Sequence, residues 1–228
     1  WLYNYFPSEW VASFLDKEPE KRKEKAIMLA KKSGFEIRKL DVNTSGRVWE
    51  ISEDGKTLIQ PLTSIKGLGE SAIEQITKNR PFEKIEDFIF NEGITYSKLN
   101  KKALDVLTRS GALNGLVDER FSGLKHFWSA VAVDRPRKEK NLLENIEKYR
   151  PEGDFDPEQM IQYSVDLTGV FPMSDVMSDA VRESLDSRLI PPLGEYDRDL
   201  GVAWGIVRKI IPRKTKTGKD YWIVEAID

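Results

Sequence analysis

Apolar residues recur at helical spacing near the start of the chain. One such segment begins at Pro7, with Ser8 in the position of an N-cap, and its apolar residues fall on one face. A second segment runs from about Glu20 to Ser33, and Gly34 is placed to end it. Both patterns predict amphipathic helices that pack against a core.

Three short segments rich in β-branched and aromatic residues follow. They cover residues 35–40, 48–51 and 56–59, and the last two are joined by a turn at Asp54 and Gly55. This pattern predicts a small β element.

Helical periodicity returns over residues 61–132. It is interrupted at the Gly67/Gly69 pair, at Pro81, around Gly93 and at Gly111. Four or five short helices fit this stretch.

Further helices are predicted beyond residue 140, in segments 142–149, 157–163 and 174–185. Segments 202–211 and 221–227 then alternate like strands around a polar loop. The pattern as a whole predicts an α+β chain that is mostly α.

Charge separates the chain into parts, although the net charge of −2 gives no indication of a polyanion partner. Residues 141–200 hold 5 basic and 14 acidic residues, whereas residues 201–228 hold 6 basic and 3 acidic ones. An acidic connector therefore lies between two mildly basic regions.

Composition excludes several classes of site. The chain has no cysteine and a single histidine, His126, so disulfides and thiolate metal sites are excluded, and histidine-based zinc or triad chemistry is disfavoured. No apolar run of membrane-spanning length occurs, and we expect no membrane partner and a cytoplasmic location. The first residue is Trp1, which indicates a piece of a longer protein.

The most specific motif is the segment Leu62–Ile76. A helix end, the turn Gly67-Leu68-Gly69 and a new helix form a helix-hairpin-helix pattern. Glycine permits positive φ and close approach of another backbone, Leu68 would hold the turn in the core, and the amides of the new helix can bind a phosphate oxygen. Lys66 and Ser71 lie beside these amides. The alternative is a tight helix corner that uses glycine for geometry only.

A looser second copy covers residues 98–113. Asn100 would cap a helix that starts with Lys101 and Lys102, and Gly111 would make the turn. An ordinary capped helix explains this segment equally well. The phosphate-binding candidates of the two copies are Lys66, Gly67, Leu68, Gly69, Ser71, Lys101, Lys102 and Gly111.

These residues resemble the bacterial replicative polymerase family, the DNA polymerase III alpha subunits (family C). Ile65–Ala72, Leu99–Leu104 and Ser110–Leu113 carry the resemblance most strongly. Pro81-Phe82 and Asp87-Phe88 lie between these segments and match in order and spacing, so the resemblance is strongest over residues 61–115. Weaker likenesses extend it in both directions: Tyr5–Ala12, Asp41–Ser45, Leu167–Gly169 with Pro172, Gly205–Val207 and Lys214–Lys219. Val170-Phe171 depart from the pattern, because the family has a histidine there.

The resemblance implies four parts: a fingers remnant (1–60), a tandem helix-hairpin-helix DNA-binding domain (61–132), the acidic helical connector (133–200) and the truncated start of an oligonucleotide-binding (OB) barrel (201–228). It implies non-sequence-specific binding of duplex and primer-template DNA behind a polymerase active site. The Mg²⁺-dependent catalytic aspartates would lie outside this segment, so we predict that the chain alone is non-catalytic. The alternatives are an accessory hairpin module that binds DNA or a protein, and a structural scaffold.

Other candidates are weaker. Single-stranded template could bind Lys214, Lys216, Lys219, Tyr221 and Trp222 through charge and stacking, and by resemblance to other hairpins the carbonyls of Thr63, Ile65 and Leu68 could hold K⁺ or Na⁺. Asp154 and Asp156 have the spacing of a metal pair, but we expect a solvated loop there. Residues 162–167 give no clear sliding-clamp motif, and His126 is predicted to be a packed histidine.

Overall fold

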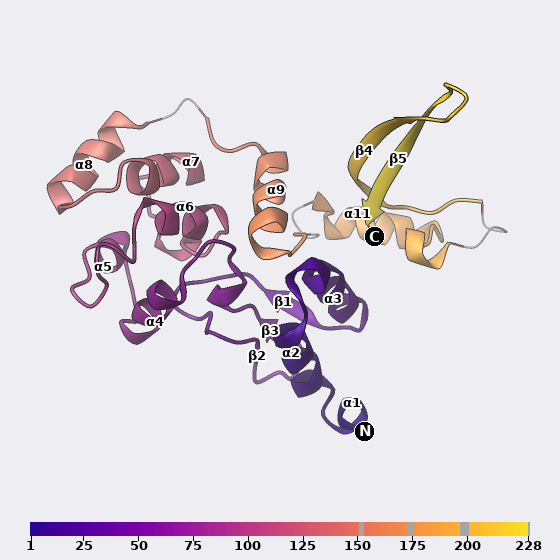
Figure 1. The fold of residues 1–228 in the computed structure, drawn as a ribbon, viewed down its shortest axis with the longest axis horizontal. Helices are drawn as coiled ribbons and strands as arrows, with labels where there is room; N and C mark the ends of the chain where they lie inside the picture. Colours follow the sequence, from indigo (N-terminus) through magenta and orange to yellow (C-terminus); the bar gives the residue numbers. More distant parts are fainter. Residues whose placement is uncertain (151–152, 173–175, 197–200, 228) are drawn as a thin grey trace. The chain divides into compact units, whose positions relative to one another are not determined.

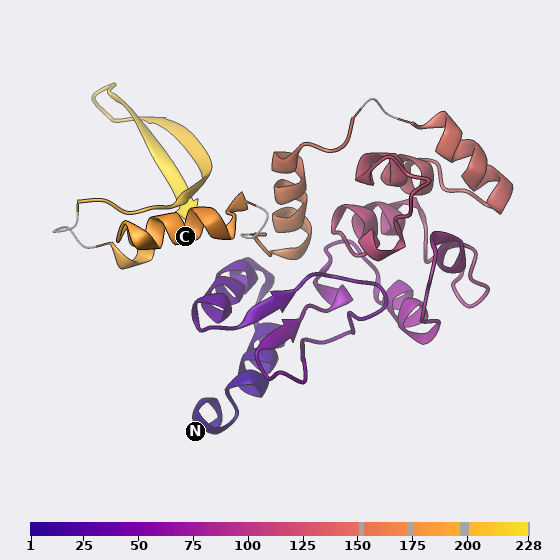
Figure 2. The ribbon, with the colours of Figure 1, turned by 180° about the vertical axis from the view of Figure 1, so that it is seen from behind.

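The computed structural model describes residues 1–150, 153–172, 176–196 and 201–227, and the chain divides into two compact units, Trp1–Pro172 and Met173–Asp228. Figures 1 and 2 draw it from opposite sides. None of the described helices combines the length and the apolar character needed to cross a bilayer.

The first unit begins with three helices and a small sheet. The strands lie in the order β1-β3-β2, with β1 parallel to β3 and β2 antiparallel to it. The elements are α1 (Leu2–Tyr5), α2 (Pro7–Lys17), α3 (Glu20–Lys32), β1 (Glu36–Arg38), β2 (Glu50–Ile51) and β3 (Thr57–Ile59). The predicted helices and β element are therefore present, with shorter strands than the sequence pattern indicates.

The start of α2 differs from the prediction. Phe6 is the N-cap residue and Pro7 the first helical residue, whereas the Ser8 hydroxyl donates to the Gly55 carbonyl at 2.6 Å. The hydroxyl thus ties the helix to the turn before β3. At the end of α3, Gly34 adopts φ +89°, as a terminating glycine should.

The faces of α2, α3 and the sheet form a core of their own. α2 packs against β2 and α3 against β1, which both views of the ribbon show. The largest buried members of this core are Leu15, Ile27, Trp49 and Leu58.

The rest of the first unit is helical. Its elements are η1 (Leu62–Ser64), α4 (Glu70–Lys78), α5 (Ile85–Ile89), α6 (Lys101–Arg109), η2 (Asn114–Leu116), α7 (Leu124–Trp128), the π-helical segment η3 (Ser129–Val133), α8 (Glu139–Lys148) and α9 (Pro157–Thr168). One core joins them, with Ile73, Leu104, Phe127 and Leu142 fully enclosed.

This core divides the chain differently from the domain boundaries implied above. Residues 133–200 were expected to be one acidic connector, but Leu142 and Ile146 of α8 and Leu167 of α9 are buried in the same core as the hairpin helices. A count of charge missed this burial, because only a few residues of α8 and α9 are apolar and face the core. The boundary between the units therefore falls after Pro172.

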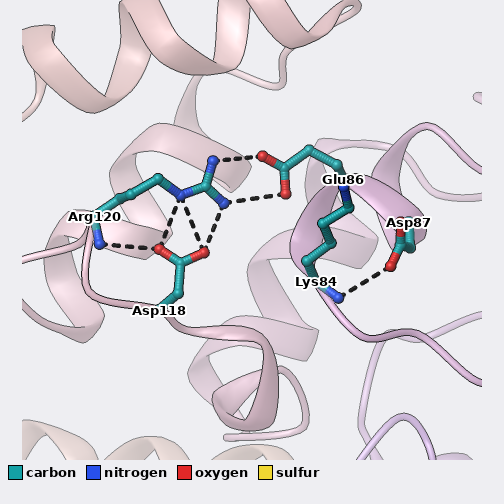
Figure 3. A network of polar contacts seen from close by, with 5 residues as sticks. All are labelled: Lys84, Glu86, Asp87, Asp118 and Arg120. Atoms are coloured by element: carbon teal, nitrogen blue, oxygen red, sulfur yellow. Dashed lines mark hydrogen bonds and ion pairs between the residues drawn. The ribbon is translucent and has the colours of Figure 1, made fainter.

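A polar network holds α5 to the loop that follows η2 (Figure 3). Arg120 bonds to both oxygens of Asp118, and its Nη1 donates to Glu86 Oε1 at 2.6 Å. Asp87 accepts from the Lys84 amide at 3.2 Å and so caps the start of α5. Arg120 thus links this loop to α5 through charge-assisted hydrogen bonds.

The second unit contains α11 (Asp179–Ser187), η4 (Leu193–Glu195) and a hairpin of β4 (Ile206–Lys214) and β5 (Asp220–Ile227). Residues 174 and 175 of the predicted helix 174–185 lie outside the described residues. The two predicted strands are present and antiparallel. The described part of this unit contains a two-stranded sheet rather than a closed barrel, so the OB-type barrel is not confirmed.

Candidate nucleic-acid interface

The first hairpin turn lies between η1 and α4. Gly67 adopts φ +88°, which favours glycine, whereas Gly69 is the N-cap of α4 with an ordinary extended backbone at φ −79°. The conformational role predicted for both glycines thus belongs to Gly67 alone. Leu68 is partly buried against the core, beside fully buried Ile65, and holds the turn as predicted.

Several amides of this turn point toward no acceptor. Within the described residues, the amides of Gly69, Glu70 and Ser71 make no hydrogen bond, as expected at a helix start. The Lys66 amide, by contrast, donates to the Leu167 carbonyl of α9 at 2.8 Å. The amides of this turn that make no hydrogen bond in the described residues therefore belong to Gly69 and the first residues of α4, not to Lys66.

A carboxylate also lies at this turn. Glu70 is the first residue of α4, and its Oε2 lies 2.5 Å from Nη2 of Arg47. The sequence did not predict this ion pair. Both side chains are largely exposed. A carboxylate at a helix start offsets part of the positive charge there, so Glu70 makes the start of α4 less positive.

The second turn precedes α6 rather than following it. Asn100 caps α6 by accepting from the Ala103 amide at 3.0 Å, as predicted. Ala103, Leu104 and Leu107 of α6 occupy the same helical positions as the buried residues Ala72, Ile73 and Ile76 of α4, counted from each N-cap. Leu99, which is fully buried, corresponds in the same way to Leu68.

This correspondence changes the assignment of Gly111. Gly111 has φ +82°, but it lies just beyond the far end of α6, a helix of nine residues that is about 13 Å long. Its turn leads into η2, and the Ala112 carbonyl there accepts from the Val42 amide at 2.9 Å. The structure thus separates Gly111 from the other candidates, and Gly111 ends α6 instead of forming the second hairpin turn.

The two turns lie side by side. A Cβ built on Gly67 would lie 3.4 Å from Cε of Lys102, so the Lys102 side chain passes over the first turn. Lys101 is directed elsewhere, since its Nζ donates to the Val133 carbonyl at 2.9 Å. Gly67 and Lys102 therefore belong to one surface.

An aromatic and basic cluster beside the second turn also escaped the sequence reasoning. Nη1 of Arg135 donates to the Tyr96 carbonyl at 2.7 Å, and the guanidinium lies 3.6 Å from the centre of the Tyr96 ring. Desolvation lowers the pKa of Arg135, which is buried. Tyr96 and Arg135 are 39 positions apart in the chain, and the signal in the sequence is limited to three basic residues within four positions, Arg135, Arg137 and Lys138.

The two carboxylates considered as a metal pair are engaged in helix starts. Asp154 accepts from the amides of Leu124 and Lys125 at the beginning of α7, at 3.1 and 2.7 Å, and Asp156 caps α9. Both carboxylates lie in an exposed loop, as expected, and the bonds from Asp154 to α7 are an addition to that prediction. No cluster of three or more metal-ligating side chains occurs in the described residues.

His126 is a packed residue, as predicted. It is fully buried, its Nε2 lies 2.7 Å from the Ile146 carbonyl, and its Nδ1 accepts from the Ser122 amide at 3.0 Å. The loosely clamp-like residues 162–167 lie within α9, where Val165 and Leu167 are buried.

The single-strand candidates lie on the hairpin of the second unit. Lys214 pairs with Asp220 at 3.7 Å, and Lys216 and Lys219 flank the turn between the strands. Tyr221 and Trp222 are both exposed, but adjacent residues of a strand face opposite sides of the sheet. The two rings therefore do not form one stacking platform.

Comparisons with known proteins agree with this geometry. Residues 34–135 match a family described as helix-hairpin-helix motif. The DNA polymerase III subunit alpha of Pseudomonas aeruginosa is 28% identical over 141 residues, covering 59% of this chain and 12% of the relative. The proteins of the same name from Thermus aquaticus and Helicobacter pylori are 24% and 22% identical, covering 94% and 100% of this chain and 19% and 22% of the relatives.

The chain thus spans about a tenth to a fifth of the length of these curated relatives. The matches are numerous and agree in name, and the helix-hairpin-helix match coincides with the two turns described above. The chain is therefore similar in sequence to part of the DNA polymerase III alpha subunits, and residues 34–135 match a helix-hairpin-helix motif.

Proposed function

We propose that this chain is the non-sequence-specific DNA-binding segment of a replicative DNA polymerase of the DNA polymerase III alpha type. The observation that carries the proposal is the juxtaposition of two helix-hairpin-helix turns, in which Lys102 of the second lies over Gly67 of the first. Two neighbouring helix starts with open amides suit the successive phosphates of a duplex, which carry no sequence information. The location we propose with this function is cytoplasmic.

The polymerase assignment is favoured over an accessory hairpin module by the extent of the matches. They cover 94% and 100% of this chain in two relatives, well beyond residues 34–135. Within the proposal, primer-template DNA is the natural substrate of the whole protein. Catalysis by two Mg²⁺ ions is assigned to parts of the polymerase outside this segment, and contacts with single-stranded template to the β4–β5 hairpin.

We further propose that K⁺ or Na⁺ binds at the first turn. In the described residues, the carbonyls of Thr63 and Leu68 accept no hydrogen bond, and that of Ile65 accepts one from Leu68 at 3.2 Å. Carbonyl oxygens at a tight turn suit a monovalent cation, which could bridge the turn to a phosphate. Equal duplex affinity in sodium, potassium and a bulky organic cation would exclude this contribution.

The function is tested by titrating duplexes of unrelated sequence at several salt concentrations. We expect similar affinities for all sequences and a log–log salt slope of about −2 to −4, from about two phosphates per turn. Replacing Lys102 by Gln should make the slope less negative by about 0.9. Lys25→Gln removes the same charge from an exposed position on α3, away from both turns, and serves as the control. Binding that depends on sequence, or no binding of duplex, would refute the proposal.

A further inference from the structure

Exposed cations without carboxylate partners gather near the second turn. In the described residues, Lys98, Lys102 and Arg137 are exposed and form no ion pair, whereas Arg47, Lys78 and Lys214 each pair with a carboxylate. Asp134, beside Arg135 in the sequence, accepts from Lys148 and Tyr149, and Glu139, two residues after Arg137, is exposed and forms no ion pair in the described residues. No carboxylate of the described residues therefore lies within ion-pair distance of Lys98, Lys102 or Arg137.

Tyr96 contacts two arginines, Arg135 and Arg137. The guanidinium carbon of Arg135 lies 3.6 Å from the centre of the Tyr96 ring, and that of Arg137 lies 5.5 Å from it. Tyr96 lies only four residues before the α6 cap Asn100. The ring thus brings the chain after η3 next to the second turn, 39 residues away along the sequence.

Arg135 is a buried cation with an incomplete set of partners. Its side chain is 6% exposed, Nη1 donates to the Tyr96 carbonyl, and Nε has no hydrogen-bond partner among the described residues. An ion buried without a carboxylate is costly, and nearby negative charge from outside the protein relieves that cost. Its position therefore favours an anion at the adjacent surface.

We propose that Arg137 binds a DNA backbone phosphate next to the second hairpin turn, and that Tyr96 and Arg135 are positioning residues that hold it there. The contact extends the interface beyond the two turns and makes the second turn, which lacks the acidic residue that Glu70 contributes to the first, the stronger of the two. This inference rests on the proposed DNA-binding function.

The test compares duplex affinity over a range of salt for Arg137→Gln and for Lys25→Gln, the exposed control on α3. Loss of one phosphate contact should make the log–log slope less negative by about 0.9 and lower affinity at 0.1 M salt by roughly a factor of eight, whereas the control should match wild type. Because Arg137 is exposed and forms no hydrogen bond in the described residues, its replacement should leave the melting temperature unchanged.

The positioning residues are tested through the ring. Tyr96→Ala should reproduce the slope of Arg137→Gln, and Tyr96→Phe, which keeps the ring, should behave as wild type. A merely structural role would lower the melting temperature of Tyr96→Ala and leave the slope of the folded protein unchanged, which would overturn the positioning role.

The two proposals fail in different ways. Absence of duplex binding by the wild-type chain would overturn the proposed function. If wild type binds and Lys102→Gln reduces the slope, but Arg137→Gln keeps the wild-type slope, then only the assignment of Arg137 is overturned.

Discussion

Asp154 offers a direct test of how the loop before α9 is attached to the hairpin helices. Its carboxylate accepts from two amides at the start of α7, those of Leu124 and Lys125, although 30 and 29 positions separate the partners. Asp154→Ala removes both acceptors and also a negative charge at the positive end of the helix.

The magnitude follows from these two losses. Loss of a helix cap costs about 1 kcal/mol, and loss of a favourable charge at a helix start adds roughly 0.3–1 kcal/mol. The amides stay near the surface, so water replaces part of the lost bonding. We expect a total of about 1–2 kcal/mol, which lowers the urea midpoint by about 0.5–1 M at a typical slope of 2 kcal/mol/M. Asp154→Asn keeps one acceptor oxygen and should lose roughly half as much.

The effect should depend on pH in a defined direction. Partial burial raises the pKa of Asp154, but hydrogen bonds from the amides of Lys125, Phe155 and Leu124 outweigh it and leave the pKa below its ordinary value. Since the folded-state pKa is lowered, the stabilisation is complete above the unfolded pKa of about 3.9 and is lost as pH falls through the folded one. Wild type and Asp154→Ala should therefore converge in strong acid.

Urea unfolding at pH 7, followed by circular dichroism, measures the loss, and hydrogen exchange of the Leu124 and Lys125 amides locates it. Glu92→Gln is the control, because Glu92 is exposed and makes no ion pair or hydrogen bond in the described residues. Equal stability of Asp154→Ala and wild type, with unchanged exchange of the two amides, would refute the reasoning.

Two further predictions concern the same core. Arg120→Met should cost about 2 kcal/mol at pH 7, because it leaves the carboxylates of Glu86 and Asp118 without their shared partner. Hydrogen bonds from Arg120 hold the pKa of both carboxyls below their usual values, so the deficit should shrink as pH falls through the folded-state pKa values; an equal deficit in urea unfolding at pH 7 and pH 3 would contradict this. Gly67→Ala should lower stability by about 1 kcal/mol, and the melting temperature by about 2–4 °C, because its φ is +88°. Gly69→Ser should be neutral or stabilising, because that N-cap has an ordinary backbone and open space around it, and equal losses at the two glycines would be the contrary result.

The elements that sequence could predict are those with a local physical cause. The 3.6-residue period identifies α4 and α6, and a cap such as Asn100 or a turn such as Gly67 depends on neighbours within a few positions. The helix-hairpin-helix match at residues 34–135 confirms that part of the interpretation.

What the sequence could not predict depends on contacts between distant segments. Asp154 caps a helix 30 residues away, and Arg135 reaches Tyr96 across 39 residues, so neither pairing has a local signature. The helix α8 was predicted, but its place in the hairpin core was not, because exposed charged residues outnumber its buried Leu142 and Ile146. The second turn was predicted at Gly111 because glycine favours turns, whereas the turn before Asn100 contains no glycine.

The net charge of −2 does not decide whether this chain binds a polyanion, because many of its carboxylates are bonded to other groups of the protein while several cations are not. Carboxylates such as Glu86, Asp118 and Asp154 are already bonded to groups of the protein, whereas Lys102 and Arg137 form no ion pair in the described part of the chain. Exposed charges are screened beyond about 8–10 Å at physiological salt. A phosphate at the second turn would therefore respond to the local cations and hardly at all to the acidic residues elsewhere.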